Sequence, residues 1–433
     1  MALTIIGLVG LLVLLGLLLV GVPIAFALAF TGVIGLLVVE GLSPTLAYMA
    51  LIPWDHGRSF VLVTVPLFVL MGQLVFHTGM ATDLYKGLRT WIGRVPGGLA
   101  IASVMACGGF GAVTGSSIAT VATMGSVVMP EIRRYDYDMR LAAGALAASG
   151  TLGILIPPSL IFIFYGVMTE TSIGALFIAG IVPGVLTLLM FSGIILVRCV
   201  VNPKLGPKGP RASWRERFRA IGLFAPVFAL FALAIGGIYA GIFTPTEAAG
   251  VGCIGVMITA LVQRKLTWSR ISAALHSTAL ISVMIFAIIL GGYSVARFLA
   301  VTGLTEDAVA LLVRLDLSEG MFLFVLVIVY LVLGSMLDVF GMLVLTIPIL
   351  LPIVTSYGFD RVWFGVFVTI MAELALVTPP IGANVFVMRR VAPDVPMGDI
   401  FLGVLPFVVG ELVLVALLVV FPQIALWLPG MMN

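Results

Sequence analysis

The sequence predicts an all-α polytopic membrane protein with two inverted-topology repeats, each containing a re-entrant hairpin and a broken helix. Three observations predict this fold. First, 62% of the 433 residues are hydrophobic and only 9% are charged, and the apolar residues form long runs, as membrane helices require. Second, a Pro-Pro step interrupts two apolar segments, LGILIPPS at Leu152–Ser159 and LALVTPPIGAN at Leu374–Asn384. Third, similar residues recur around the two steps at a constant spacing. We therefore treat residues 1–433 as a single integral membrane domain.

The first apolar run, Ala2–Val39, contains no charged residue. As one helix it would be roughly 57 Å long, nearly twice the ~30 Å thickness of a hydrocarbon core. It is therefore expected to form two passes hinged near Gly21–Pro23. A cleaved signal peptide is the alternative, but the basic segment that precedes such a signal is missing. The cysteines Cys107, Cys199 and Cys253 lack the spacing of a metal site or a disulfide framework.

Residues 198–219 form the longest polar segment, with a single acid, Glu216, among many basic residues. By the positive-inside rule this segment is a cytoplasmic loop. Nucleic-acid binding is the alternative for such a basic run, but neither interleaved aromatic residues nor a folded domain accompanies it. The passes counted outward from this loop are Leu141–Met168, Ser172–Val197, Ile221–Gly241 and Ala248–Val262, and an earlier pass is Val61–Phe76.

Gly97–Pro130 contains 34 residues without a charge, and basic residues flank it on both sides. The segment should therefore enter and leave on the same face, as a re-entrant hairpin does. Its tip would be CGGFGAVTGSS at Cys107–Ser117. Two full crossings are the alternative, although the segment is short for them. With the broken helix, this hairpin forms a first repeat core at residues 97–197.

Thr244–Glu247 has the pattern of a capping box before a helix. Thr244 would be the N-cap, Pro245 would occupy the first turn, and Glu247 would bond back to the N-cap. A Glu247 side chain facing a substrate is the alternative.

An offset of 222 positions relates the two Pro-Pro steps, Pro157 and Pro379. At this offset Tyr135 corresponds to Tyr357 and Asp138 to Asp360, and further similar pairs follow without a gap. The loop charges indicate that the two copies are inverted, because the region after the first break is acidic and the region after the second is basic. The second repeat core covers residues 320–429.

Asp338 is the only charged residue between Gly320 and Phe359, in LGSMLDVFGM. A carboxylate in a membrane segment is costly and is therefore a candidate for function. Solvation at a hairpin mouth is the alternative. Glu373 and Glu411 also lie in apolar runs, and Glu373 could be structural.

Each half thus offers a hairpin tip and a broken helix. Unwinding frees carbonyl oxygens, which together with hydroxyl groups suit a hard monovalent cation such as Na⁺. Half-helix N-termini would in addition favour an anionic substrate. The candidates for a first sodium site are Thr114, Ser116, Ser117, Gly153 and Ser159. The candidates for a second are Gly334, Ser335, Asp338, Thr378, Gly382 and Asn384. The helix breaks themselves are at Pro157, Pro158, Pro379 and Pro380.

Several motifs in this order resemble the large membrane subunit of tripartite ATP-independent periplasmic (TRAP) transporters. They are GSSIATVATMGSVVMPE (Gly115–Glu131), LGILIPPS (Leu152–Ser159), IAGIVPG (Ile178–Gly184), FTPTEAAG (Phe243–Gly250), LGSMLD (Leu333–Asp338) and ELALVTPPIGANVF (Glu373–Phe386). The resemblance covers essentially the whole chain. One departure from the family pattern is Thr114, where a serine is frequent.

The resemblance implies a sodium-driven importer of organic anions, of the C4-dicarboxylate or sialic-acid-like kind, in a bacterial inner membrane. It implies elevator-type movement of a transport domain that holds both hairpins, with Na⁺ as the coupling ion and no other cofactor. On the family pattern, Ser159 and the first hairpin tip carry one sodium site, and Asp338 and TPPIGAN carry the other. The implied partners are a small four-helix membrane subunit, expected to be a separate polypeptide, and a periplasmic substrate-binding protein.

Two other functions remain as alternatives. A stand-alone ion-coupled carboxylate symporter or antiporter of related inverted-repeat fold would work without a binding protein. An intramembrane enzyme is a different class. The sequence argues against it, because His56, His77 and His276 all lie away from the breaks and the hairpin tips, and no catalytic spacing occurs.

Overall fold

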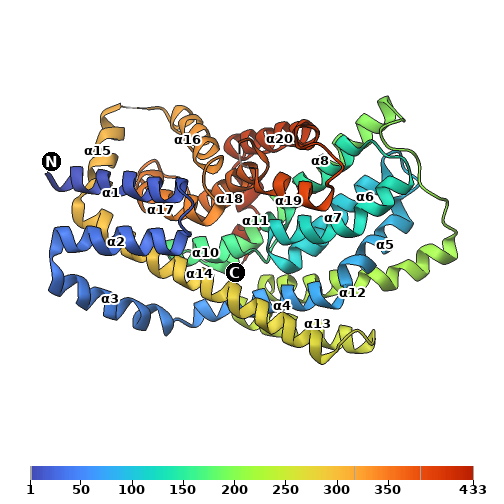
Figure 1. Ribbon diagram of the computed structural model, residues 1–433, viewed down its shortest axis with the longest axis horizontal. Helices are drawn as coiled ribbons and strands as arrows, with labels where there is room; N and C mark the ends of the chain where they lie inside the picture. Colours follow the sequence, from blue (N-terminus) through green and yellow to red (C-terminus); the bar gives the residue numbers. More distant parts are fainter. Residues whose placement is uncertain (1, 316, 381, 433) are drawn as a thin grey trace.

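The computed structural model describes residues 2–315, 317–380 and 382–432, so Ile381 of the second break lies outside the described residues. The described part is helical (Figure 1). Its elements are α1 (Ala2–Leu19), α2 (Ile24–Glu40), α3 (Leu42–Gly57), η1 (Phe60–Val63), α4 (Thr64–Thr78), α5 (Met80–Ile92), α6 (Gly98–Thr114), α7 (Ser117–Arg134), α8 (Met139–Ser149), α9 (Leu152–Leu155), α10 (Leu160–Thr169), α11 (Ile173–Val201), α12 (Trp214–Tyr239), α13 (Pro245–Val262), α14 (Trp268–Thr302), α15 (Leu304–Leu315), α16 (Glu319–Gly334), α17 (Val339–Ser356), α18 (Arg361–Val377), α19 (Ala383–Val391), α20 (Met397–Val420), α21 (Gln423–Leu426) and η2 (Pro429–Met431).

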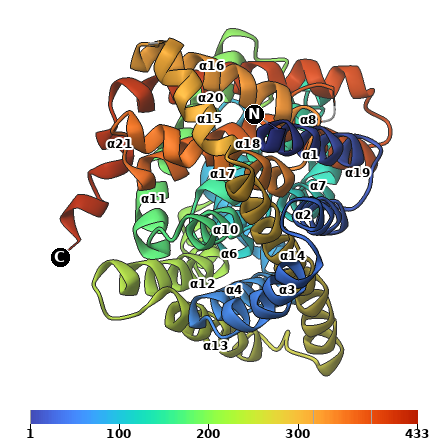
Figure 2. The ribbon, with the colours of Figure 1, turned by 90° about the vertical axis from the view of Figure 1, so that its left-hand side faces the viewer.

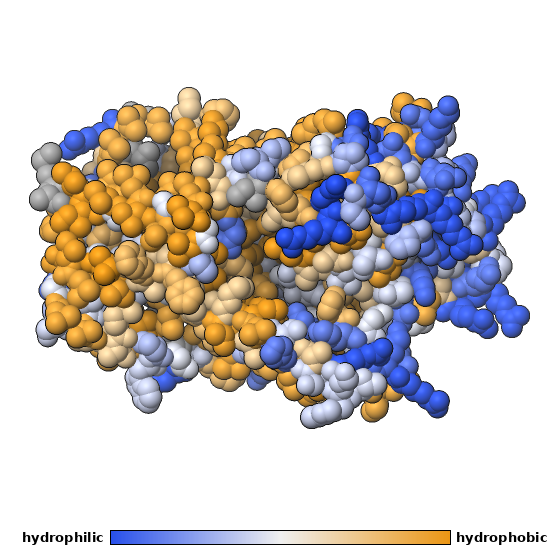
Figure 3. All heavy atoms as spheres, viewed as in Figure 1, coloured by the Kyte–Doolittle hydropathy of each residue, from blue (hydrophilic) through white to orange (hydrophobic). Residues whose placement is uncertain are grey.

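Membrane-spanning character is distributed along the whole chain. Within the described ranges, seven helices are long and apolar enough to cross a membrane, or eight if the bent pair around the first break is one span. Hydrophilic side chains gather at the right-hand end of the molecule in Figure 3, around the ends of α5, α6 and α12 in the view of Figure 1. The remaining visible surface is largely apolar, as a surface in contact with lipid would be.

The N-terminal helices pack against α14, a helix of 35 residues. The uncharged N-terminal run forms two helices, α1 and α2, and the chain reverses between them at Val20–Pro23, which confirms the predicted hinge. Figures 1 and 2 both place α2 along α14. Contact is close because Gly32 of α2 leaves no room for a β-carbon against the backbone of Ser294 and Val295. An ion pair of 2.8 Å between Glu40 and Arg297 joins the same two helices.

Helices α6 and α7 form the first hairpin, with its tip at Gly115 and Ser116. Gly115 has a φ of +61°, which allows the chain to reverse between the two helices. At the opposite end, both arms return to one loop: the amide of Gly97 donates to the Gly206 carbonyl and that of Asp138 to the Leu205 carbonyl. Both ends of the segment therefore lie together, as a re-entrant hairpin and two full crossings alike require.

Helices α16 and α17 form the second hairpin, and Ser335–Asp338 connect them. Asp338 is the N-cap of α17, where its carboxylate accepts a hydrogen bond from the amide of Gly341 at 2.8 Å. The far ends of the two arms meet where Phe322 stacks on Tyr357 with ring centroids 4.6 Å apart.

The order of elements in the two halves agrees with the repeat offset of 222. Ser117–Arg134 of α7, shifted by 222 positions, gives Val339–Ser356 of α17, and the start of α8 at Met139 gives the start of α18 at Arg361. Both Pro-Pro bonds are cis. The shared spacing of residues therefore reflects a shared order of secondary structure.

The two broken helices run antiparallel to one another. Arg140 at the start of α8 pairs with Asp399, which follows α19, at 2.6 Å. At the other end, the Tyr165 hydroxyl in α10 donates to the carbonyl of Arg361 at the start of α18, over 2.7 Å. This arrangement is what inverted repeats require.

The helices reach further into the basic segment than the predicted loop allows. Helix α11 continues to Val201 and α12 begins at Trp214, so the non-helical part is residues 202–213 rather than 198–219. The apolar stretches on both sides and an N-cap at Ser213 extend these helices. The predicted capping box at α13 is confirmed, since Thr244 bonds to the Glu247 amide and Glu247 bonds back to the Thr244 amide. Glu247 therefore caps α13 in this structure, as predicted.

Candidate functional site

The hairpin tips and the helix breaks of both halves meet around one small cavity of about 120 Å³. It lies where four helices begin, because the first residues of α7, α10, α17 and α19 line it. The lining includes Ser116, Ser117, Leu160, Asp338 and Ala383. Residues more than 200 positions apart in the sequence therefore share one site.

In the first half, the hairpin tip lies directly against the break. A β-carbon on Gly111 would lie 2.3 Å from the Cα atom of Gly153, so the two backbones touch. The Ser116 carbonyl accepts a hydrogen bond from the Thr120 hydroxyl at 2.7 Å, and Thr120 lies 3.3 Å from the Thr114 hydroxyl. Ser159 is buried at the N-cap of α10. The structure thus brings the five candidates of the first sodium site to one tip and one break.

Asn384 connects the second half to the first. Its side-chain amide donates to the Ser117 hydroxyl at 2.7 Å and to the Ala147 carbonyl at 3.1 Å. Asn384 is fully buried, and its Oδ1 atom has no hydrogen-bond partner among the described residues. The structure therefore places Asn384, a candidate for the second site, beside the first hairpin tip as well.

In the second half, Gly334 and Ser335 end α16, and Asp338 begins α17. Gly334 packs against Ala375 of α18, where a β-carbon would lie 2.3 Å from the Ala375 methyl carbon. The Ser335 hydroxyl donates to the carbonyl of Val332 at 2.7 Å. The second tip thus contacts the helix that leads into the second break.

The second break differs from the first in exposure. Pro157 and Pro158 are buried, whereas Pro379 and Pro380 are exposed. Thr378 is the C-cap of α18, and its buried hydroxyl oxygen makes no hydrogen bond within the described part of the chain. Because an unpaired buried hydroxyl is costly, it is available to a ligand.

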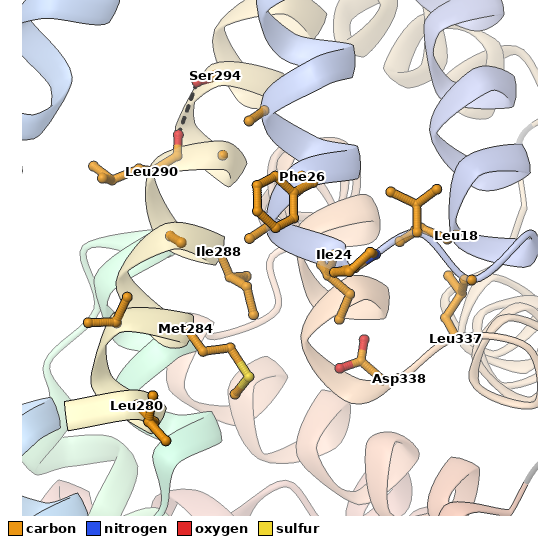
Figure 4. A pocket seen from close by; sticks show the side chains of 18 of the residues that line it. Leu18, Ile24, Phe26, Leu280, Met284, Ile288, Leu290, Ser294, Leu337 and Asp338 are labelled. Carbon is orange, nitrogen blue, oxygen red and sulfur yellow. Dashed lines mark hydrogen bonds between the residues drawn. The ribbon is translucent and has the colours of Figure 1, made fainter. Parts of the chain in front are cut away.

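A larger cavity of about 780 Å³ opens beside the same carboxylate (Figure 4). It lies between the α1–α2 connection, α14 and the tip of the second hairpin. Figure 4 shows Asp338 extending into a space that Ile24, Phe26 and Met284 surround. Asp338 therefore lines both cavities, the small one with Ser116 and Ser117 and the large one among mainly apolar side chains.

Sequence reasoning missed several polar residues behind the site. Thr120 completes the first tip, and Thr151 contacts Glu411 at 3.0 Å. Thr151 occupies the position that corresponds to Glu373 at the offset of 222, so the repeat itself could have indicated it. In the described ranges, no cluster of three or more His, Cys, Asp or Glu side chains could hold a metal ion. The oxygen atoms that could bind a cation around the cavity belong to hydroxyl, amide and carbonyl groups and to one carboxylate.

This arrangement defines a class: a multi-pass helical membrane protein in which two hairpins and two antiparallel broken helices enclose a central site. Residues 11–424 match the family model described as "Tripartite ATP-independent periplasmic transporter, DctM component". The chain belongs to this family, as a TRAP transporter large permease subunit and multi-pass protein of the bacterial inner membrane.

Relatives with different named substrates are similar over nearly their whole lengths. The chain is 34% identical to the C4-dicarboxylate TRAP transporter large permease protein DctM of Pseudomonas aeruginosa, covering 93% of this chain and 94% of the relative. It is 32% identical to the ectoine permease protein TeaC of Halomonas elongata, covering 96% of both. It is 31% identical to the sialic acid permease protein SiaM of Vibrio cholerae, again covering 96% of both.

The fold also resembles a solved transporter structure. The YdaH transporter of Alcanivorax borkumensis aligns with a TM-score of 0.59 over 89% of this chain and 90% of that one, at 16% identity. At this identity the likeness concerns the fold alone.

Proposed function

We propose that the protein imports a small organic anion across the bacterial inner membrane, driven by a sodium gradient. The observation that carries this proposal is the convergence of four helix N-termini, those of α7, α10, α17 and α19, on one cavity. Each N-terminus carries a partial positive charge and free amide donors. An anionic group is therefore favoured in this cavity.

Sodium would bind next to the anion, where helices end rather than begin. Helix α6 ends at Thr114 and α16 at Gly334, and the last carbonyl oxygens of a helix have no partner within it. Thr378 adds a buried hydroxyl group without a partner in the described part, and Asp338 adds a negative charge. Carbonyls, hydroxyls and a single carboxylate form the oxygen environment that a hard cation prefers.

Coupling follows from this proximity. A bound sodium ion lowers the electrostatic cost of placing an anion beside Asp338, and the anion in turn favours sodium. Asn384 links the second break to the first tip through its hydrogen bond to Ser117. Through this bond, an ion bound in one half would affect the affinity of the other half for its ligand. The two halves thus bind as one unit.

The movement proposed is of the elevator type. Both hairpins and both broken helices contact each other around the cavity, whereas α1–α3 pack on α14 at one side (Figures 1 and 2). The first group would move as a body past the second, with α14 as part of the scaffold. The antiparallel broken helices supply the two related arrangements that alternating access needs.

The partners proposed are a periplasmic substrate-binding protein and a small four-helix membrane subunit. An isethionate permease protein of Oleidesulfovibrio alaskensis, named DctMQ, is 32% identical and is longer, since the match covers 65% of it. Its length and double name are consistent with a second membrane component fused to a chain like this one. Helices α1 and α3 offer exposed apolar side chains for such a subunit or for lipid.

The substrate proposed carries a carboxylate or sulfonate group. The substrates named for the relatives are C4-dicarboxylates, ectoine, sialic acid and isethionate, which share an anionic acid group and little else. A site built from helix N-termini recognises the acid group of a substrate and is insensitive to the rest of the substrate molecule. Selection among anions would then lie with the binding protein.

Transport is tested in proteoliposomes that contain the chain with its small subunit and binding protein. We expect uptake of radiolabelled succinate, sialic acid, ectoine or isethionate only with an inward sodium gradient. Sodium-independent uptake would refute the coupling. Uptake without the binding protein would favour the stand-alone symporter or antiporter.

Sodium binding is tested separately on the purified chain with ²²Na⁺. Asp338→Asn should weaken sodium binding at least tenfold, equivalent to about 1.4 kcal/mol. Asp55→Asn is the matched control, because Asp55 is an exposed carboxylate in α3 without a bond among the described residues. Equal affinities in wild type and Asp338→Asn would remove Asp338 from the site.

A further inference from the structure

Two glutamates lie in the interior behind the helix breaks. Glu373 of α18 is 0% exposed and Glu411 of α20 is 1% exposed. Helices α18 and α20 pack against each other, and the two carboxyl groups interact electrostatically. The proposed sodium and substrate sites use neither of them.

No basic side chain compensates these carboxyl groups within the described ranges. Both oxygens of Glu373 and the Oε2 atom of Glu411 are buried without a hydrogen-bond partner. Two uncompensated carboxylates in a dry interior are strongly disfavoured, since each loses its hydration and repels the other. The pair therefore requires positive charge from a ligand.

Thr151 shows how one of the oxygens is oriented. Its hydroxyl oxygen lies 2.7 Å from the Ala148 carbonyl and 3.0 Å from Oε1 of Glu411. A hydroxyl has a single hydrogen, and a carbonyl only accepts. The Thr151 hydroxyl can donate to Oε1 of Glu411. When its hydrogen points to the Ala148 carbonyl instead, the Thr151 oxygen faces Oε1 with a lone pair, and a cation or proton between the two oxygens then makes the contact favourable.

Charged and titratable groups on the surrounding helices make no hydrogen bond to either carboxyl group within the described ranges. The elements packed against α18 and α20 are α8–α11, α16, α17, α19 and α21. None of their charged or titratable residues contacts either carboxyl group in the described part of the chain. These residues, with those at the starts of α18 and α20, are Arg140, Tyr165, Arg198, Cys199, Glu319, Tyr330, Arg361, Arg389, Arg390 and Asp399.

We propose that Glu373, Glu411 and Thr151 form a further binding site for an exchangeable monovalent cation. Three unpaired carboxylate oxygens and one hydroxyl surround it, which suits either a proton shared by the pair or a sodium ion. The site lies between the breaks: Thr151 is two residues before Gly153, and Glu373 is five residues before Thr378. A bound cation would fix the position of the first broken helix relative to the second.

The experiment uses the purified full-length chain in detergent and measures cation binding without transport. A failure would therefore leave the transport proposal untouched. The variants are Glu373→Gln, Glu411→Gln and the double substitution, with Glu319→Gln, an exposed glutamate at the start of α16, as the control. Glutamine keeps the shape of the side chain and removes its charge, and a melting curve reports whether each variant is folded.

Two readouts distinguish the two cations. If sodium occupies the site, the double variant binds one ²²Na⁺ fewer per chain than wild type and than Glu319→Gln. If a proton occupies it, the carboxylic-acid band in infrared spectra changes between pH 5 and 9 in wild type but not in the double variant. For a variant that fails to fold, Thr151→Val provides a milder change, expected to shift the sodium affinity or the pH midpoint of wild type. Unchanged sodium stoichiometry together with a pH-independent infrared spectrum in wild type would overturn the proposal.

Discussion

Gly153→Ala tests whether contact between the first hairpin tip and the first break is needed for sodium binding. A β-carbon at this position would lie 2.9 Å from the Thr120 hydroxyl oxygen, 3.1 Å from the Gly111 Cα atom and 3.2 Å from the Ser116 carbonyl oxygen. The Thr120 side chain can rotate away, but the two backbone atoms can move only if the tip is displaced. We therefore expect a separation of a few tenths of an ångström between tip and break.

The magnitude follows from the cost of overpacking. An extra methyl group in a packed interior typically costs about 1–3 kcal/mol. If this strain is relieved when the tip moves away from the break, it destabilises the sodium-bound state more than the sodium-free state. The sodium concentration for half-saturation should then rise about 5- to 150-fold.

Two other glycines provide a graded comparison. Gly111→Ala should be more severe than Gly153→Ala, because its β-carbon would lie 2.3 Å from the Cα atom of Gly153. Gly193→Ala in α11 is the matched control, because nothing lies within 4 Å of its β-carbon position. Alanine there should leave sodium binding unchanged and stabilise the helix slightly.

The assay is ²²Na⁺ binding to each purified variant, with thermal melting as the measure of folding. The expected order of sodium affinity is wild type equal to Gly193→Ala, then Gly153→Ala, then Gly111→Ala. A folded Gly153→Ala protein with the sodium affinity of wild type would refute the reasoning, because the tip would then be free to move without affecting the ion.

Three further changes test other contacts. Asn384→Ala removes the bonds to Ser117 and the Ala147 carbonyl, and should lower the unfolding free energy by about 1–3 kcal/mol; a melting temperature equal to that of wild type would contradict this. The hydrogen bond from Arg133 lowers the pKa of Asp394, so their contact contributes stability above the usual aspartate pKa of about 3.9 and loses it as the pH falls through the lower folded value. The melting difference between wild type and Arg133→Gln should accordingly be present at neutral pH and vanish in strong acid, whereas a difference that grows in acid would have the wrong sign. Glu247→Ala should lower the melting temperature slightly, because the Thr244 amide loses its partner in the α13 capping box, without changing sodium affinity; a change in that affinity would indicate substrate or ion contact.

Local features of the fold could be predicted from the sequence because their causes are local. Pro-Pro steps cannot continue a helix, so the breaks at Pro157 and Pro379 were predictable without tertiary information. The same is true of the hinge near Pro23 and of the Thr244–Glu247 cap, which the structure confirms. The ends of the helices around residues 198–219 were less predictable, because helix termini depend on caps and on tertiary contacts.

The amino-acid sequence by itself determined the membrane class, the order of hairpins and breaks, and the identity of Asp338 as an isolated carboxylate. These follow from hydropathy, from backbone chemistry and from one repeated spacing. Only the tertiary structure decided that Asn384 bonds to Ser117, 267 positions away, and that Thr151 contacts Glu411, 260 positions away. No local pattern encodes such pairs, because they result from packing two antiparallel halves together. That packing brings four helix N-termini to one cavity and leaves Glu373 buried without a partner in the described part of the chain.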